Sequence, residues 1–335
     1  RPIFGWGFEN FYMAFNQNFN PQSLEFSFYE TWFDSAHNIF LNTLATTGII
    51  GLLSYLALYG ATIIMVVKGM KRGNLSHSEG FILIGFLCTD FGSKLFVFDH
   101  PSSYLLLFGV MAMSSDSAMP QHESTVMTTV SSFKGYALLF ASLGVATALI
   151  FNTDIVVLRG NNKTLQAMRA LHTDPRHALQ YVRAALSYPT PHIVDVRLDL
   201  AHDIKGIATF LSNHMEKDEF VALLTEVLNE LEHAKKVSPR DVQVYMADAD
   251  LALLLAQSDA RFYERVEEDY KSAIALSPTR QQLYYMYAKA KAVRGDFNGA
   301  LKQLDFAVEL DKKVGYSYWM RAYIRDQGKL DPQLV

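Results

Sequence analysis

A histidine and an asparagine, His37 and Asn38, stand at the start of a long uncharged segment. No charged side chain occurs from Ile39 to Val67, and two glycines, Gly48 and Gly51, lie inside this stretch. A neutral imidazole, whose unperturbed pKa is about 6.5, is well suited to accept a proton from a hydroxyl group. The pattern therefore indicates a candidate general base, His37, at the end of an apolar helix.

The elements that must position this histidine are membrane helices. A helix over the uncharged segment is long enough to cross the ~30 Å hydrocarbon layer of a bilayer. Within the next apolar stretch, Asp90 and Lys94 are four residues apart and share one helix face. An internal ion pair is favoured over a polar groove for a lipid headgroup, because charges inside a span are normally paired. We predict four spans, at 39–67, 80–98, 102–115 and 135–155. The alternative for the second and third is a short helical hairpin instead of two full crossings.

The distribution of basic residues orients these spans. Lys68, Lys71 and Arg72 directly follow the first span, and Lys134 precedes the fourth. Cytoplasmic loops carry the excess of lysine and arginine, so both of these loops should be cytoplasmic. The outer loop 1–38, the turn at Asp99 and the C-terminal half are then expected on the extracytoplasmic side.

The composition excludes several functions. The chain has 335 residues and a net charge of −4, and it offers no basic stripe to neutralise nucleic-acid phosphates. A single cysteine, Cys88, excludes internal disulfides and cysteine metal clusters. The histidines of the C-terminal half lack the spacing of a helical zinc site, and no carboxylate cluster of the magnesium type lies near His37. We therefore expect no metal and no cofactor.

The C-terminal half repeats itself. Three segments align at one offset: Ser238-Pro239 leads to Tyr245, Ser277-Pro278 to Tyr284, and Asp311-Lys312 to Tyr318. The last two copies are 34 residues apart, which is the period of tetratricopeptide repeats. The earlier spacing is longer by five residues, an insertion placed near 257–261, and Asp174-Pro175 begins a degenerate earlier copy. Residues 159–335 are predicted to form an all-α solenoid of such repeats, whose concave surface binds a protein or peptide partner.

The motif H-N-x9-G-x-x-G, carried by His37, Asn38, Gly48 and Gly51, resembles the O-antigen ligase and O-antigen polymerase family. The opening segment, residues 1–11, is similar to the glycine-rich segment that precedes the family's large outer loop. A weaker match covers 96–104. Some members of the family carry a tetratricopeptide tail.

The resemblance implies an all-α membrane glycosyltransferase of the GT-C type, with residues 1–158 as part of its membrane domain. Such enzymes move a glycan from a polyprenyl diphosphate to an acceptor hydroxyl in lipopolysaccharide and cell-envelope synthesis. His37 would serve as the base, and Arg1 would bind the diphosphate. Glu30 and Asp34 either orient His37 or the acceptor, or are a solvated pair of loop carboxylates. Asn38 either caps the helix or contacts substrate. The glycines are expected to be structural, with Gly48 and Gly51 allowing close helix approach; they are Gly5, Gly7, Gly48 and Gly51.

The family needs more spans than four, so the chain is interpreted as the C-terminal part of a longer, multi-pass protein of the bacterial inner membrane. Alone, this part is expected to be inactive. Two alternatives remain open: a protein-glycosylating oligosaccharyltransferase of the same superfamily, and a non-enzymatic membrane-anchored repeat scaffold. The enzyme predicts His37 at the rim of a polar groove, whereas the scaffold predicts a lipid-facing His37.

Overall fold

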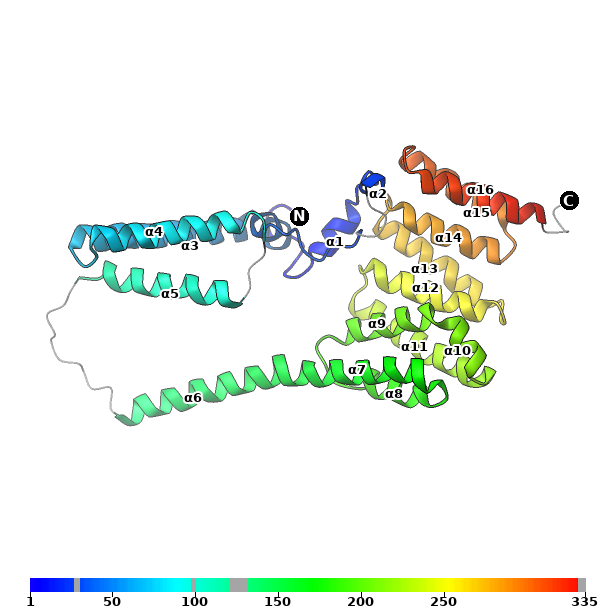
Figure 1. The fold of residues 1–335 in the computed structure, drawn as a ribbon, viewed down its shortest axis with the longest axis horizontal. Helices are drawn as coiled ribbons and strands as arrows, with labels where there is room; N and C mark the ends of the chain where they lie inside the picture. Colours follow the sequence, from blue (N-terminus) through cyan, green and yellow to red (C-terminus); the bar gives the residue numbers. More distant parts are fainter. Residues whose placement is uncertain (27–30, 98–100, 121–131, 331–335) are drawn as a thin grey trace. The chain divides into compact units, whose positions relative to one another are not determined.

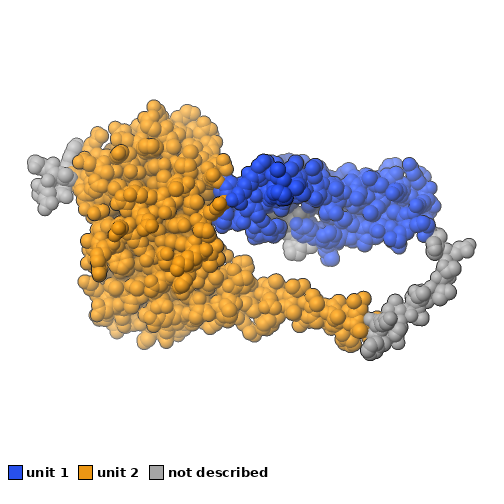
Figure 2. All heavy atoms as spheres, turned by 180° about the vertical axis from the view of Figure 1, so that it is seen from behind, with its two compact units in different colours: residues 1–15, 30–132 blue, residues 16–29, 133–335 orange. Residues whose placement is uncertain are grey.

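The computed structural model describes the chain except for residues 27–30, 98–100, 121–131 and 331–335. The described residues form helices and turns with no β-strand among them, which confirms the predicted all-α class. They divide into two compact units, coloured separately in Figure 2: residues 1–15 with 30–132, and residues 16–29 with 133–335. We call the first the apolar unit and the second the repeat unit.

The apolar unit is built on the helices α3 (Ile39–Arg72), α4 (His77–Ser93) and α5 (Pro101–Ala118). Helix α3 packs against both α4 and α5 (Figure 1). Tyr59, Leu87 and Leu107, one from each helix, form a small buried cluster. Helix α1 (Phe11–Gln17) begins in this unit, and its last two residues belong to the repeat unit.

Local signals set the turn between α3 and α4. Helix α3 ends at Gly73, which adopts the left-handed conformation (φ 75°) that glycine tolerates best. Helix α4 then begins with a capping box, in which Ser76 and Glu79 satisfy each other's backbone N–H groups. The chain therefore reverses within a few residues and brings the two helices side by side.

Two helices are long and apolar enough to cross a membrane in the part of the chain that the structure describes: Ile39–Arg72 and Gly135–Thr173. They include the predicted spans 39–67 and 135–155. The predicted spans at 80–98 and 102–115 correspond to α4 and α5, which are helical but do not meet the same measure of length and composition. Their crossing of a membrane stays a prediction.

The repeat unit starts with a continuous helical run. Helix α6 (Ser132–Ile150) passes through a short π-helix, η1 (Phe151–Ile155), into α7 (Val156–Thr173). The remaining elements stack in sequence order (Figure 1). They are a 3-10 turn η2 (Pro175–His177), α8 (Ala178–Leu186), α9 (Ile193–Gly206), α10 (Ala208–His214), α11 (Lys217–Val237), α12 (Val242–Ala256), α13 (Phe262–Leu276), α14 (Gln281–Val293), α15 (Phe297–Leu310) and α16 (Gly315–Leu330), with α2 (Ser23–Phe26) from the N-terminal region.

The predicted repeat register is visible in the helix ends. Helices α11, α13 and α15 each end one residue before the aligned Ser238, Ser277 and Asp311, and the next helix begins four residues after each. In two copies the aligned tyrosine makes the same contact: the hydroxyl of Tyr245 donates to the Pro239 carbonyl at 3.1 Å, and that of Tyr284 donates to the Pro278 carbonyl at 2.8 Å. The tyrosine thus closes the turn that precedes its own helix.

The irregular parts of the repeat also have structural counterparts. The turn 257–261 between α12 and α13 is longer than 294–296 between α14 and α15, and α12 has 15 residues where α14 has 13. Helix α13 has 15 residues where α15 has 14, so the predicted insertion is shared between the turn and the two helices beside it. In the degenerate early copy, Ala178 and Ala185 of α8 are both buried, as small residues at a close helix crossing should be.

The predicted domain boundary at 158/159 lies within the continuous run from α6 to α7. The compact units divide the chain elsewhere. Residues 16–29 of the predicted outer loop and residues 133–158, which hold the predicted fourth span, belong to the same unit as the repeats.

Candidate functional site

A cleft of about 820 Å³ lies in the apolar unit, at the N-terminal half of α3. Of the residues predicted to act in chemistry, it brings together His37 and Asp34. Sequence reasoning did not anticipate the other residues that line the cleft, and Gly51 had been assigned only a structural role. These residues are Phe8, Glu9, Ser35, Ile39, Asn42, Thr43, Thr46, Thr47, Gly51, Ser54, Tyr55, Leu58 and Tyr104.

A kink in α3 explains how the N-terminal segment reaches the cleft. Gly48 has φ 70° and ψ −169°, which interrupts the helical hydrogen-bond ladder. The freed groups find partners in the first residues of the chain: Trp6 N donates to Ala45 O at 2.9 Å, Gly7 N donates to Thr46 O at 2.8 Å, and Ile49 N donates to Pro2 O at 2.9 Å. The kink therefore holds the segment that carries Phe8 and Glu9.

The motif glycines make this contact possible. A Cβ atom on Gly48 would lie 2.1 Å from the Ile3 carbonyl oxygen, and one on Gly5 would lie 2.3 Å from the Thr46 carbonyl carbon. The close approach at Gly48 is thus made by the N-terminal segment, where the sequence had suggested a neighbouring helix. Gly5 and Gly7 also have positive φ angles of 68° and 104°.

Asn38 joins the start of α3 to the end of α4. Its side-chain oxygen accepts from Leu41 N at 3.0 Å, so it caps α3, and its amide group donates to Leu95 O at 3.0 Å. The neighbouring Ile39 N donates to Lys94 O at 3.0 Å. This is the capping role that the sequence offered as one interpretation of Asn38. Asn38 does not line the cleft.

Both His37 and Glu9 adopt left-handed backbone conformations, with φ angles of 48° and 62°. They are the two non-glycine residues with positive φ in the described part of the chain, and both line the cleft. This conformation is unfavourable for residues that carry a Cβ, and such strain is concentrated at functional sites. Two residues with this strained backbone line the same cleft, which makes the cleft the candidate functional site.

The cleft presents acceptors and aromatic faces. Two carboxylates, Glu9 and Asp34, line it, and no lysine or arginine is among the lining residues. The hydroxyl groups of Thr46 and Thr47 donate to backbone carbonyls one turn earlier, at 2.8 and 2.7 Å, so their oxygens remain available as acceptors. The side-chain oxygen of Asn42 is buried and receives no hydrogen bond from the described residues. Such a lining suits a ligand that is rich in hydroxyl donors.

Asp90 and Lys94 form the internal ion pair that the sequence favoured. Their charged groups are 3.4 Å apart, and both side chains are buried. The hydroxyl of Tyr59 donates to Asp90 at 2.5 Å, and the Lys94 ammonium lies 6.0 Å from the ring centre of Tyr104. The pair therefore connects α3 and α4 and reaches the edge of the cleft through Tyr104.

Two predicted substrate-binding residues are not found in the cleft. The guanidinium of Arg1 lies over the ring of Trp6, 5.0 Å from its centre, and Arg1 does not line the cleft. Glu30 lies outside the described residues.

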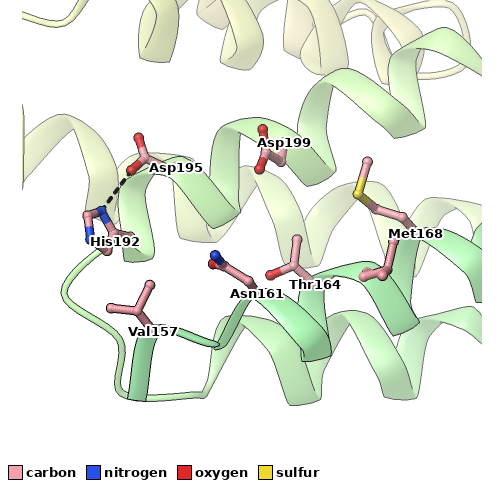
Figure 3. A pocket seen from close by; sticks show the side chains of 8 residues that line it. Val157, Asn161, Thr164, Met168, His192, Asp195 and Asp199 are labelled. Atoms are coloured by element: carbon pink, nitrogen blue, oxygen red, sulfur yellow. Dashed lines mark hydrogen bonds and ion pairs between the residues drawn. The ribbon is translucent and has the colours of Figure 1, made fainter. Parts of the chain in front are cut away.

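A second cavity, of about 340 Å³, lies between α7 and α9 in the repeat unit. Figure 3 shows His192, Asp195 and Asp199 along its α9 side and Asn161 and Thr164 along its α7 side. His192 Nδ1 lies 3.3 Å from Asp195 Oδ2, and burial together with the nearby Asp195 raises the pKa of Asp199. No group of three or more histidine, cysteine or acidic residues within the described chain is placed to hold a metal ion.

Comparisons with known proteins do not identify a family for this chain. No protein-family model matches the chain. No curated protein matches it either. Among solved structures, the chain is similar to "MamA RS-1 ArsTM double mutant", with a TM-score of 0.34 and 12% sequence identity, over 54% of this chain and 99% of that chain.

Proposed function

We propose that the chain carries the acceptor side of a membrane glycosyltransferase similar to O-antigen ligases and polymerases. The enzyme would transfer a glycan from a polyprenyl diphosphate to an acceptor hydroxyl, with His37 as the general base. The observation that carries the proposal is the cleft at the start of α3, which combines His37, two carboxylates and aromatic side chains.

The proposed transfer forms one bond, breaks one bond and moves one proton. The acceptor oxygen attacks the anomeric carbon of the glycan, the bond from that carbon to the diphosphate oxygen breaks, and the acceptor proton passes to the imidazole of His37. Polyprenyl diphosphate leaves with the bonding electrons. Asp34 and Glu9 line the same cleft as His37 and supply acceptor oxygens there.

The remaining lining residues support a glycan as the cleft's ligand. Tyr55 and Tyr104 offer ring faces, and Asn42 offers a buried oxygen that lacks a donor among the described residues. Sugar rings present C–H groups for such faces and hydroxyl donors for such oxygens. A diphosphate requires cationic partners, so it would lie outside this cleft; Arg1 is the candidate for it in the N-terminal segment.

The test compares two histidine variants of the full-length parent, assayed with purified lipid-linked glycan. Asparagine tolerates the left-handed backbone of residue 37, so His37→Asn removes the imidazole while keeping the fold. We expect turnover to fall by about 10²–10⁴-fold, with normal membrane levels. His77→Ala is the matched control, because His77 is exposed at the start of α4 and does not line the cleft. Near-normal turnover in His37→Asn would refute the catalytic assignment.

The same assay separates the enzyme alternatives. A saccharide acceptor supports the ligase or polymerase reaction, and a protein hydroxyl as acceptor supports a protein-glycosylating oligosaccharyltransferase. If neither acceptor is used, the scaffold gains, and one observation favours it: the repeats already hold a peptide segment, residues 16–26, through Ser277, Thr279 and Arg280.

The proposal includes a location. Two helices of spanning length and composition suggest membrane association. We propose a multi-pass protein of the bacterial inner membrane, with His37 and the repeats on the extracytoplasmic side, because the last turn of α3 carries the basic residues Lys71 and Arg72.

A further inference from the structure

A segment from the N-terminal region is bound by the turn between α13 and α14. We call residues 16–26 the strap; they belong to the repeat unit. Ser277 Oγ donates to the Asn16 carbonyl at 2.6 Å, and Thr279 Oγ1 donates to the Phe19 carbonyl. Asn16, Phe19 and Leu24 of the strap are each at least nine-tenths buried. The strap is therefore held as a ligand, not merely passed over the surface.

Arg280 is the centre of this contact. Its guanidinium donates to the side-chain oxygen of Asn16 at 2.6 Å and lies over the ring of Phe19, 4.1 Å from its centre. The residue is fully buried, and burial lowers its pKa to about 9. Burying a guanidinium is costly unless its N–H groups are used. The amide oxygen and the ring face of the strap offset part of that cost, and Gln282 accepts a further hydrogen bond from the guanidinium at 3.1 Å.

An arginine at the N-cap of a helix is unusual, because N-cap residues normally accept a hydrogen bond from the helix backbone. Residue 280 is the N-cap of α14 and makes no capping hydrogen bond, whereas the corresponding Asp241 caps α12 by accepting from Gln243 N at 2.9 Å. Arginine has no acceptor and cannot cap a helix N-terminus. The repeat thus gives up a cap at this position, which is expected where a residue serves another purpose.

We propose that the turn 277–280 is a binding site for the strap and that Arg280, through it, is a positioning residue for the His37 cleft. The link runs along the chain. Asn16 directly follows Phe15, whose ring lies edge-on to that of Phe33 at 5.1 Å. Phe33 in turn precedes Asp34, a residue of the cleft. The part of this inference that concerns glycan transfer rests on the proposed function.

The experiment uses the full-length protein in a Cys88→Ser background, with one reporter cysteine at a time. Leu24→Cys reports on the strap, and Ser35→Cys reports on the cleft. Arg280→Ala should raise the maleimide labelling rate of both reporters at least about 10-fold. The strap would no longer be held by the turn 277–280, and the cleft residues that it positions would become more accessible. Arg240→Ala is the control, because Arg240 is exposed in the corresponding turn one repeat earlier, and it should change neither rate.

Asn16→Ala removes the same hydrogen bond from the strap side and guards against a folding defect of the Arg280 variant. It should raise both labelling rates while the helical content stays unchanged. An unchanged rate for the strap reporter in both variants would overturn the binding site. A faster rate for the strap reporter with an unchanged rate for the cleft reporter would overturn the positioning role.

Transfer assays then test whether loss of the strap contact weakens binding of the acceptor. Arg280→Ala should raise the KM for the acceptor about 10-fold and leave the KM for the lipid-linked donor unchanged. Equal effects on both, or a loss of kcat alone, would indicate general unfolding and overturn the positioning role. If His37→Asn keeps its turnover, the proposed function fails, while the two labelling rates still decide whether the strap is bound and linked to the cleft.

Discussion

The apolar helices α3 to α6 and the repeat helices α8 to α16 place their apolar side chains in opposite ways. Within the repeats, leucines such as Leu223, Leu251 and Leu304 are completely buried. On the apolar helices, Phe81 and Leu105 are 68% and 75% exposed. None of the most apolar stretch of Gly135–Thr173 is buried, and only 17% of that of α3 is. The apolar side chains of the repeats are buried against other repeats of this chain. Those of the apolar helices are left on the surface, where contact with water is unfavourable.

The comparison indicates what each region needs. Exposed apolar area costs about 25 cal/mol per Å², so such helices are stable only when lipid or further protein covers them. The repeats need no such cover, and each helical pair is covered by the next. Environment should therefore matter for the first region, and internal contacts for the second.

The largest expected effect concerns the side of the membrane. In a Cys88→Ser background, we expect a cysteine at position 71 to stay unlabelled by an impermeant reagent in intact cells. A cysteine at position 259 in the repeats should be labelled fully. The reason is the basic end of α3, which carries Lys71 and Arg72. Labelling of both positions, or of neither, would contradict the proposed topology.

A buried charge should show how strongly the repeats depend on internal contacts. Asp248 is fully buried, accepts two hydrogen bonds of 2.6 Å from Arg265, and lies 3.0 Å from Lys235. Asp248→Ala leaves the half-buried cations Lys235 and Arg265 without this buried partner, so unfolding free energy should fall by about 3–5 kcal/mol. Thermal and denaturant unfolding, followed by circular dichroism, measures the change.

Asp259→Ala is the matched control, because its ion pair with Arg261 is at the surface. Exposed pairs contribute little, so this variant should lose only about 1 kcal/mol or less, including the hydrogen bond that Arg261 N donates to the Asp259 carboxylate. Equal losses in the two variants would mean that burial does not set the strength of these ion pairs.

The repeats were predictable from sequence because their signals are local. The Ser-Pro…Tyr spacing is closed by one hydrogen bond within each turn, so the register survives in every copy that keeps these residues. The apolar unit was predictable only in part. His37 and Asp34 were found by motif, but Glu9 and Tyr104 reach the cleft from distant segments, through a kink at Gly48 and the packing of α5. Arg280 had a signal that was missed, an arginine at an N-cap position.

The kink offers a test of the apolar unit's internal order. Gly48→Ala forces a Cβ onto a left-handed residue and against the backbone of Ile3. We expect a loss of at least about 2 kcal/mol, seen as a lower midpoint of thermal unfolding in detergent. Gly60→Ala, also in α3, meets nothing within 4 Å and should stabilise by about 0.5–1 kcal/mol. A harmless Gly48→Ala would show that the N-terminal segment is not held at the kink.

The smallest expected effect tests the cap that α12 has and α14 lacks. Burial raises the pKa of Asp241 to about 6, from an ordinary value near ~4. A carboxyl group whose folded pKa is raised favours the folded state when protonated. Its contribution is therefore present below about pH 4 and is lost as the pH rises to about 6. Asp241→Asn stays neutral and can still cap the helix.

We therefore expect Asp241→Asn to be more stable than the parent by roughly 2 kcal/mol at pH 7.5, and nearly equal to it at pH 4. The difference between the two pH curves isolates Asp241, because other carboxyls with raised pKa values, such as Asp199, remain in both proteins. Parallel curves would show that the charge on Asp241 costs nothing. A loss at every pH would instead mean that the charged oxygen strengthens the cap by more than its burial weakens it.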